Sequence, residues 1–313
     1  MAVILRPTDW RDLRVLHRYR SKGLYLDTAQ VLTRGSSFTS GVFRSFFSPT
    51  TDAFTWICAD DCGHQPVLGQ FAHVPESAFA RLTLLAPEGA LESKITIDLL
   101  EQLTRQAGEH GAFHLLAEIP EQSNAFESLR KAGFVVYARQ RVWKLRENDD
   151  GFKVMIPWET AVKDKINFAQ SLYHNLVPGM VQQIEPLPSK NVGGLVCYDN
   201  EDLLGYVDLK SGPRGIWAQP FIHPDTADVD ARLKDLFESI PNRRSRPVYL
   251  CVRSYQSWLE LALDAMEAEP GPQQAVMVKH LAAQHPVKRP FALPQIDGQH
   301  EITTPVAQSR RNS

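Results

Sequence analysis

A turn that leads into a helix is the first place in this sequence where the residue types could support chemistry. The turn reads Ala86-Pro87-Glu88-Gly89-Ala90-Leu91-Glu92-Ser93, and an amphipathic segment continues to about Gly108. The free N–H groups and positive dipole end at the start of a helix bind anions such as phosphate. This turn has one glycine, no basic residue and two carboxylates, Glu88 and Glu92. A carboxylate about 4–6 Å from a phosphate repels it by about 1 kcal/mol or more, so we interpret both as charges that complement the helix dipole.

Three other groups of residues are candidates for chemistry, and each has a plainer interpretation. His223 precedes a proline in a turn and could act as a base, but a solvated turn histidine is the commoner case. The spacing of Cys58, Cys62 and His64 fits no zinc pattern, and we therefore expect no metal site. The run Arg243–Arg246 could contact a phosphate, but we interpret it as a solvated loop before a strand.

The elements around the turn follow one another in a definite order. The apolar run Ala80–Leu85 predicts a strand, and Leu91, Ile95, Leu99 and Leu103, four apart, predict one buried stripe on a helix. A second apolar run, Phe113–Ile119, is followed by a short helical segment that ends Arg130-Lys131-Ala132-Gly133-Phe134, and then by the alternating run Gln140–Leu145. The order is strand, turn, helix, strand, helix ending in Gly-Phe, and strand.

This order resembles the acyl-CoA-binding half of a GNAT acyltransferase. Ala125, Lys131 and Gly133-Phe134 match a second landmark of that family, although Gln122 stands where the family has Asn, with Asn124 close by. The resemblance implies an α/β (α+β) fold with a mixed sheet and helices on both faces. It also implies that two central parallel strands splay apart and that acetyl-CoA or another acyl-CoA enters the splay as co-substrate.

Carried onto this chain, the resemblance implies cofactor contacts on the strand and on the turn after it. The pantetheine arm would pair with the strand Leu82–Leu85, and the pyrophosphate would lie at the turn Pro87–Glu92. The implied cofactor-binding residues are Leu84, Leu85, Gly89, Ala90, Leu91 and Asn124. Leu129 occupies the position where many members of the family have a tyrosine general acid, so no catalytic residue is identified.

The second half of the chain repeats the pattern of the first. Equivalent landmarks are separated by a nearly constant number of residues. The separation is 136 for the pair Gly69/Gly205, 137 for Pro87/Pro224, 134 for Leu129/Leu263 and 134 for Gln140/Gln274. An internal duplication is the simplest account. We therefore expect two tandem GNAT-like domains, at residues 1–147 and 148–287, and a flexible tail at residues 288–313. The alternative is that both halves are merely α/β.

Composition excludes several classes of protein. The chain has 313 residues, of which 34 are Lys or Arg and 36 are Asp or Glu, and this balance gives no overall field that would attract nucleic acid. No apolar run approaches the length of a membrane span, and the N-terminus lacks the features of a signal peptide. We expect a cytoplasmic protein, a monomer or homodimer, with no nucleic-acid or membrane partner.

Two functions remain open from the sequence. The first is acyl transfer from acyl-CoA to an amine of a small molecule or peptide, as the resemblance implies. The second is a catalytically silent tandem GNAT-fold protein that serves as a binding module or scaffold, which Glu88, Glu92, Leu129 and Leu263 favour. The resemblance places the acceptor pocket in the early segments of each half, at about Leu24–Pro49 and Leu176–Pro188.

Overall fold

The computed structural model describes eight stretches of the chain: residues 3–19, 21–35, 53–60, 65–146, 158–161, 166–187, 194–199 and 202–281. All of them lie in one compact unit, Met1–Ala283. The expected domain boundary at 147/148 and the expected tail at 288–313 fall outside the described residues, so both stay predictions.

The described part of the first half contains strands and helices in the expected alternation. In chain order these are β1 (Val3–Pro7), the short 3-10 helix η1 (Trp10–Asp12), α1 (Leu13–Tyr19), β2 (Leu24–Tyr25), α2 (Thr28–Arg34), β3 (Ala53–Asp60), β4 (Val67–His73), β5 (Phe79–Ala86), η2 (Glu88–Ala90), α4 (Lys94–Glu109), β6 (His114–Pro120), α5 (Ala125–Lys131) and β7 (Val135–Leu145).

The second half repeats this order of elements. It contains β8 (Glu159–Thr160), α6 (Ile166–Leu176), α7 (Gly179–Ile184), β9 (Gly194–Asp199), β10 (Asp202–Ser211), β11 (Ile216–Ile222), α8 (Val229–Ser239), β12 (Val248–Arg253), η4 (Ser254–Gln256), α9 (Leu259–Ala265) and β13 (Glu269–His280).

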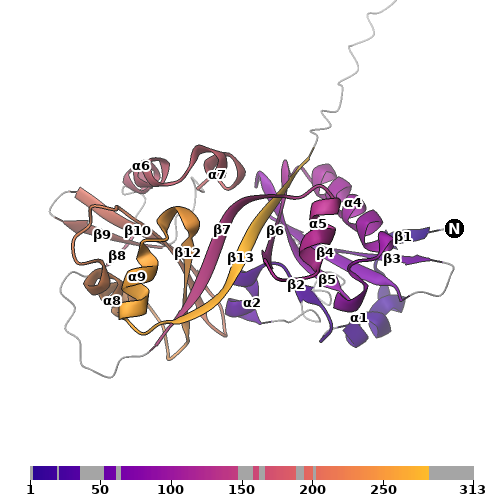
Figure 1. Ribbon diagram of the computed structural model, residues 1–313, viewed down its shortest axis with the longest axis horizontal. Helices are drawn as coiled ribbons and strands as arrows, with labels where there is room; N and C mark the ends of the chain where they lie inside the picture. The colour runs from indigo at the N-terminus through magenta and orange to yellow at the C-terminus, as the bar shows by residue number, and fades with distance from the viewer. Residues whose placement is uncertain are drawn as a thin grey trace, which may run out of the picture. The chain divides into compact units, whose positions relative to one another are not determined.

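All described strands join in one mixed sheet, in the order β1-β3-β4-β5-β6-β13-β7-β12-β11-β10-β9-β8, with β2 beside β5. The last strand of each half lies next to the other half. Strand β13 pairs antiparallel with β6 of the first half, and β7 pairs antiparallel with β12 of the second half. β7 and β13 also pair with each other, and Figure 1 shows them side by side between the two groups of strands. The two halves are therefore joined by an exchange of strands.

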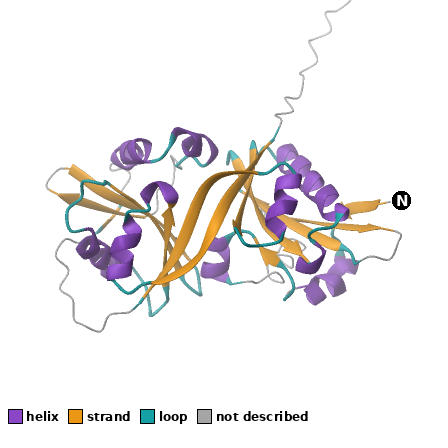
Figure 2. Ribbon diagram, viewed as in Figure 1, coloured by secondary structure: helices purple, strands orange, loops and turns teal. Residues whose placement is uncertain are grey.

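Helices cover both faces of the sheet, as expected (Figure 2). Alternate residues of β11 show the two faces: Ile216 and Ala218 pack into the cluster that contains α8 and α9, whereas Trp217 packs against α2 and Phe221 against α6 and α7. In the first half, α4 and α5 share a core with Leu115 and Ala117 of β6, while Leu116 faces α6 and α7. One face thus carries α4, α5, α8 and α9, and the other carries α1, α2, α6 and α7.

Three local expectations differ from the structure. The long helix begins at Lys94 rather than near Leu91, because η2 takes up the turn. The run Pro157-Trp158-Glu159 predicts the start of a helix that extends to about His174, but Glu159 and Thr160 form the edge strand β8 and the helix α6 begins at Ile166. Pro157 lies outside the described residues. Trp158 is anchored to α8 by its indole Nε1, which donates to the carbonyl of Arg232 at 2.9 Å. β2 and α2 were not expected as a strand and a helix.

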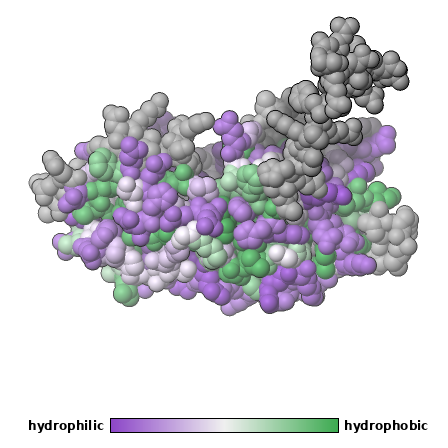
Figure 3. Space-filling model, turned by 90° about the horizontal axis from the view of Figure 1, so that it is seen from above, coloured by the Kyte–Doolittle hydropathy of each residue, from purple (hydrophilic) through white to green (hydrophobic). Residues whose placement is uncertain are grey.

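Among the described residues, no helix is both long enough and apolar enough to cross a bilayer. Figure 3 shows hydrophilic and hydrophobic residues interspersed on the face that it displays.

Candidate functional site

Each half contains two parallel strands that diverge, as the resemblance implied. β5 and β6 are paired only from Phe79 to Arg81, opposite His114 to Leu116. β11 and β12 are paired only from Ile216 to Ala218, opposite Val248 to Leu250. Beyond these three pairs the strands separate toward their C-terminal ends and leave a wedge in each half. We call these the first wedge and the second wedge.

The first wedge is filled by the chain itself. Leu24 and Tyr25 of β2 pair antiparallel with Leu85 and Leu84 of β5. The next residue, Leu26, bridges both arms of the wedge: its N–H donates to the carbonyl of Thr83 at 3.0 Å, and its carbonyl accepts from the N–H of Glu118 at 2.9 Å. The backbone edge that an acyl-CoA pantetheine arm would use is therefore already paired.

The inserted segment, residues 22–28, is also fixed at its C-terminal end. Asp27 caps α2 by accepting a hydrogen bond from the N–H of Gln30 at 3.0 Å, and the Glu118 carboxylate accepts from the N–H of Thr28 at 2.9 Å. The Leu26 side chain is only 1% exposed and belongs to the core beneath α4. This segment is thus an integral part of the fold rather than a loop lying on it.

Several N–H groups of the turn after β5 are also paired within the protein. The N–H of Glu88 donates to the carbonyl of Lys22 at 2.8 Å, the N–H of Ala90 to Pro87 at 3.0 Å, and the N–H of Leu91 to Glu88 at 3.3 Å. They belong to the turn at which the resemblance places a pyrophosphate.

The remaining predicted cofactor residues lie at the surface. Gly89 is exposed, and a Cβ built there meets no atom within 4 Å, so nothing in the free protein requires a glycine. Asn124 is exposed at the start of α5 and makes no side-chain cap. The assignment of Leu84, Leu85, Gly89, Ala90, Leu91 and Asn124 to a cofactor stays a prediction.

The second wedge is filled by a side chain instead of a strand. Gln256, in η4, is 2% exposed. Its Nε2 donates to the carbonyl of Pro220 at 2.9 Å, and its Oε1 accepts from the N–H of Ile222 at 3.1 Å. The side-chain amide therefore satisfies the inner edge of β11 as a backbone peptide would. Pro220 itself has no N–H to offer.

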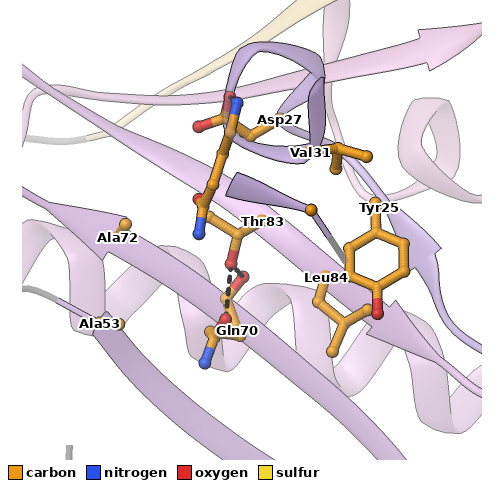
Figure 4. A pocket seen from close by; sticks show the side chains of 10 residues that line it. Tyr25, Asp27, Val31, Ala53, Gln70, Ala72, Thr83 and Leu84 are labelled. Carbon is orange, nitrogen blue, oxygen red and sulfur yellow. Dashed lines mark hydrogen bonds between the residues drawn. The ribbon is translucent and has the colours of Figure 1, made fainter. Parts of the chain in front are cut away.

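A small cavity of about 50 Å³ lies beside the first wedge (Figure 4). Gln70 and Thr83 are prominent in its lining: Thr83 Oγ1 lies 3.0 Å from Gln70 Oε1, and Gln70 Nε2 donates to Thr55 Oγ1 at 2.9 Å. A cavity of this volume holds a few water molecules at most. We therefore do not assign it a substrate.

A larger pocket of about 260 Å³ lies on the face of the sheet that carries α6 and α7. It is lined by residues from both halves: Phe79, Arg81, Tyr173, Val181, Glu185, Pro186, Leu187, Asp208, Lys210, Gln219, Phe221, Arg253 and Tyr255. The second of the segments predicted to build an acceptor pocket, Leu176–Pro188, contributes Val181 and Glu185 to Leu187. We call this the central pocket.

A network of buried charges lies at the wall of the central pocket. Arg253 Nη2 lies 3.2 Å from each carboxylate oxygen of Glu185, and Arg81 Nη2 lies 3.4 Å from Glu185 Oε2. The hydroxyl of Tyr137 donates to the same carboxylate. Arg81 also contacts Glu118 at 3.2 Å, which connects the network to the first wedge.

The pKa values of these groups follow from their contacts. Burial alone would raise the pKa of Glu185, but Arg253 and Arg81 outweigh it and hold the pKa below its ordinary value. Burial alone would lower the pKa of Arg253, but Glu185 outweighs it and raises the pKa. Both groups are therefore charged at neutral pH, and each depends on the other for its burial.

The other candidates from the sequence make structural contacts. His223 Nδ1 lies 3.3 Å from the N–H of Asp225, as in a turn cap. Arg246 Nη1 donates to the carbonyl of Gly212 at 2.7 Å, and Arg243 lies over the ring of Phe237. No three metal-binding side chains cluster within the part of the chain that the structure describes, and Cys62 and His64 lie outside it.

Sequence reasoning missed the residues that define the site most clearly: Leu26, Gln256 and Glu185. No spacing rule marks a leucine that bridges two strands or a glutamine that replaces one. Leu26 and Glu185 had a weak signal, because each falls in a segment predicted to line the acceptor pocket, whereas Gln256 had none.

Comparison with known proteins supports the fold. No family model and no curated protein matches the chain. A solved "tandem GNAT protein from the clavulanic acid biosynthesis pathway", without AcCoA, is similar over 89% of this chain and 98% of its own, with a TM-score of 0.53 and 14% identity. A GCN5-related N-acetyltransferase from Sphaerobacter thermophilus is similar over 89% of this chain and 95% of its own, with a TM-score of 0.54 and 13% identity.

At these identities the likeness concerns architecture, and it extends over both halves of the chain. The repeated order of elements and the two pairs of diverging strands agree with it. By its architecture the chain has the tandem GNAT fold.

Proposed function

We propose that the protein is a catalytically silent tandem GNAT-fold protein that binds a small molecule in the central pocket. The observation that carries this proposal is that both wedges are filled by the protein: the first by residues 22–28 and the second by the amide of Gln256. An acyl-CoA molecule would have to compete with these internal contacts for the same backbone groups.

The cost of opening the first wedge can be estimated. Displacing residues 22–26 breaks the hydrogen bonds Glu88 N–Lys22 O, Leu26 N–Thr83 O and Glu118 N–Leu26 O, each contributing about 1 kcal/mol. It also exposes the Leu26 side chain, at about 2 kcal/mol. A total of about 5 kcal/mol would weaken acyl-CoA binding by more than about a thousandfold.

Negatively charged side chains at the turns before α4 and α8 would also weaken acyl-CoA binding. Glu88 and Glu92 are exposed at the turn before α4, and Asp225 and Asp228 are exposed at the turn before α8. Each would lie near the pyrophosphate of an acyl-CoA held as the resemblance implies. Repulsion between like charges further opposes its binding.

One observation favours a second candidate function, which is acyl transfer from acetyl-CoA or another acyl-CoA to an amine. Both halves keep the divergence of their central strands after three residue pairs. In this reading residues 22–28 move aside, the cofactor contacts the predicted residues of the first half, and a small-molecule or peptide amine enters the central pocket. Leu129, which is fully buried, could not return a proton to the departing thiolate.

Calorimetric titration of the folded protein with acetyl-CoA distinguishes the two candidates. We expect no heat of binding at high micromolar concentration. Saturable binding that is lost in Gly89→Glu would contradict the proposal and support acyl transfer, since Gly89 has open space around it and the variant should fold. Binding that Gly89→Glu leaves intact would contradict the proposal too, and would place the cofactor away from the predicted turn.

A further inference from the structure

The central pocket contains two charged side chains on a single strand that make no hydrogen bond or close ion pair among the described residues. Asp208 and Lys210 both lie on β10, two residues apart, and both line the pocket. Within the described stretches, no hydrogen bond or ion pair joins either side chain to another group. Asp208 is half-buried and Lys210 is exposed, so a ligand in the pocket can reach both.

The wall of the pocket offers further unpaired donors. Arg253 is only 3% exposed, and its Nε and Nη1 have no hydrogen-bond partner among the described residues. Among the described residues, only its third nitrogen, Nη2, makes a hydrogen bond, and the acceptor is Glu185. Buried N–H donors without acceptors are costly, and a negative charge that a ligand brings near the guanidinium would offset part of that cost.

The other charged groups at the wall of the pocket pair with one another. Arg81 interacts with Glu185, Asp27 and Glu118, and Arg253 is paired with Glu185. A ligand that carries one charge of each sign could pair with the two remaining groups at once, whereas a ligand with a single charge could pair with only one of them. The pairing within the network leaves Lys210 and Asp208 as the two charges available to such a ligand.

Apart from the polar side chain of Gln219, the remaining lining is apolar and aromatic: Phe79, Tyr173, Val181, Pro186, Leu187, Phe221 and Tyr255. Such walls favour an apolar group on the ligand. The volume of about 260 Å³ is that of a small metabolite rather than a peptide.

We propose that the central pocket binds a free α-amino acid with an apolar side chain. Its ammonium group pairs with Asp208, its carboxylate pairs with Lys210 and faces the Arg253 guanidinium, and its side chain lies against the aromatic walls. This inference rests on the proposed ligand-binding function and names the ligand class of that pocket.

The pKa of Asp208 is raised in the folded protein. Burial raises the pKa of its carboxyl group, and Lys210 and Arg81 offset only part of that rise. A ligand ammonium beside the carboxylate would offset more of it.

Calorimetry with L-leucine and two of its analogues tests the inference. 4-Methylpentanoate keeps the carboxylate and lacks the amine, and 3-methylbutylamine keeps the amine and lacks the carboxylate. We expect L-leucine to bind and each analogue to bind about tenfold more weakly or worse, because each loses one charge-assisted contact. An analogue that binds as tightly as L-leucine would overturn the pairing, and so would the absence of binding by any of the twenty common amino acids.

Two variants test which residues pair with the charged groups of the ligand. Asp208→Asn and Lys210→Gln should each weaken L-leucine binding by about tenfold or more. Asp202→Asn, an exposed position at the start of the same strand, should leave binding unchanged. Lys210 is exposed, so Lys210→Gln is expected to fold; unchanged binding in that folded variant would refute the assignment.

The calorimetric results with amino acids and with acetyl-CoA distinguish a failure of this inference from a failure of the proposed function. If neither amino acids nor acetyl-CoA bind, the amino-acid inference fails and the closed wedges remain supported. If acetyl-CoA binds, the proposed silent function fails whatever the amino-acid result.

Discussion

Replacing Glu185 by glutamine should destabilise the protein strongly, although the substitution only replaces one carboxylate oxygen by an amide NH2 group. Glu185 accepts hydrogen bonds from Arg253, Arg81 and Tyr137. Glutamine keeps the size and one acceptor oxygen, but it removes the negative charge that compensates Arg253, which is 3% exposed. Breaking a buried ion pair by removing one partner costs about 3–5 kcal/mol, and the retained oxygen puts Glu185→Gln near the lower end, at about 3 kcal/mol.

The assay is urea unfolding followed by far-UV circular dichroism, with the free energy extrapolated to water. Glu127→Gln is the matched control, because Glu127 makes an ion pair with Arg130 at 3.1 Å while both side chains are about 60% exposed. Exposed pairs contribute about 0–1 kcal/mol, so this variant should unfold at nearly the wild-type urea concentration. Both variants replace a glutamate by glutamine, so the difference between their free energies of unfolding reports the effect of burying the ion pair.

Equal stability of Glu185→Gln and Glu127→Gln would refute the reasoning. It would mean that Arg253 finds other partners once Glu185 is neutral, and that the buried network does not hold the two halves at the central pocket.

Three further predictions concern the wedges, the sheet and pH. Gln256→Ala leaves the carbonyl of Pro220 and the N–H of Ile222 without their partner and should lower the free energy of unfolding by about 2–4 kcal/mol in urea; a loss below about 0.5 kcal/mol would show that water replaces the amide. Gly194→Ala places a Cβ 2.1 Å from a carbonyl oxygen of β10 and should cost about 2 kcal/mol or more, measured by thermal unfolding, whereas Gly179→Ala, with no atom within 4 Å, should be near neutral. Because the pKa of Glu185 is lowered in the folded state, its contribution is complete above its ordinary value of 4.5 and is lost as pH falls through the lower folded value, so wild-type stability should decline there more steeply than that of Glu185→Gln.

The fold could be predicted because its elements carry local signals. The four-residue spacing of Leu91, Ile95, Leu99 and Leu103 predicted α4, and Gly133-Phe134 marked the end of α5. The order of these elements, repeated once, was enough to predict two pairs of diverging strands. The structure has them at β5–β6 and β11–β12.

The partners of the last strands could not be predicted from the sequence. The alternation in Val135–Leu145 is the same whether β7 pairs within its own half or with β12 of the other half. Periodicity fixes which face of a strand is buried, but it does not name the neighbouring strand.

The candidate site was less predictable than the fold because its contacts join distant residues. Arg81, Glu185 and Arg253 are brought together from three segments far apart in the chain. β2 is two residues long, too short for a period to be seen, and Gln256 acts through the geometry of its amide. None of these features has a local pattern.

The exchange of β7 and β13 constrains how the protein can be synthesised. When the ribosome has completed β7, the edge of β6 still lacks its neighbour, because that neighbour, β13, is formed by residues 269–280. Ala275 pairs with Ile119, more than 150 residues earlier in the chain. The nascent first half therefore has an exposed strand edge until residues 269–280 have been translated, and such an edge is prone to pairing with other chains.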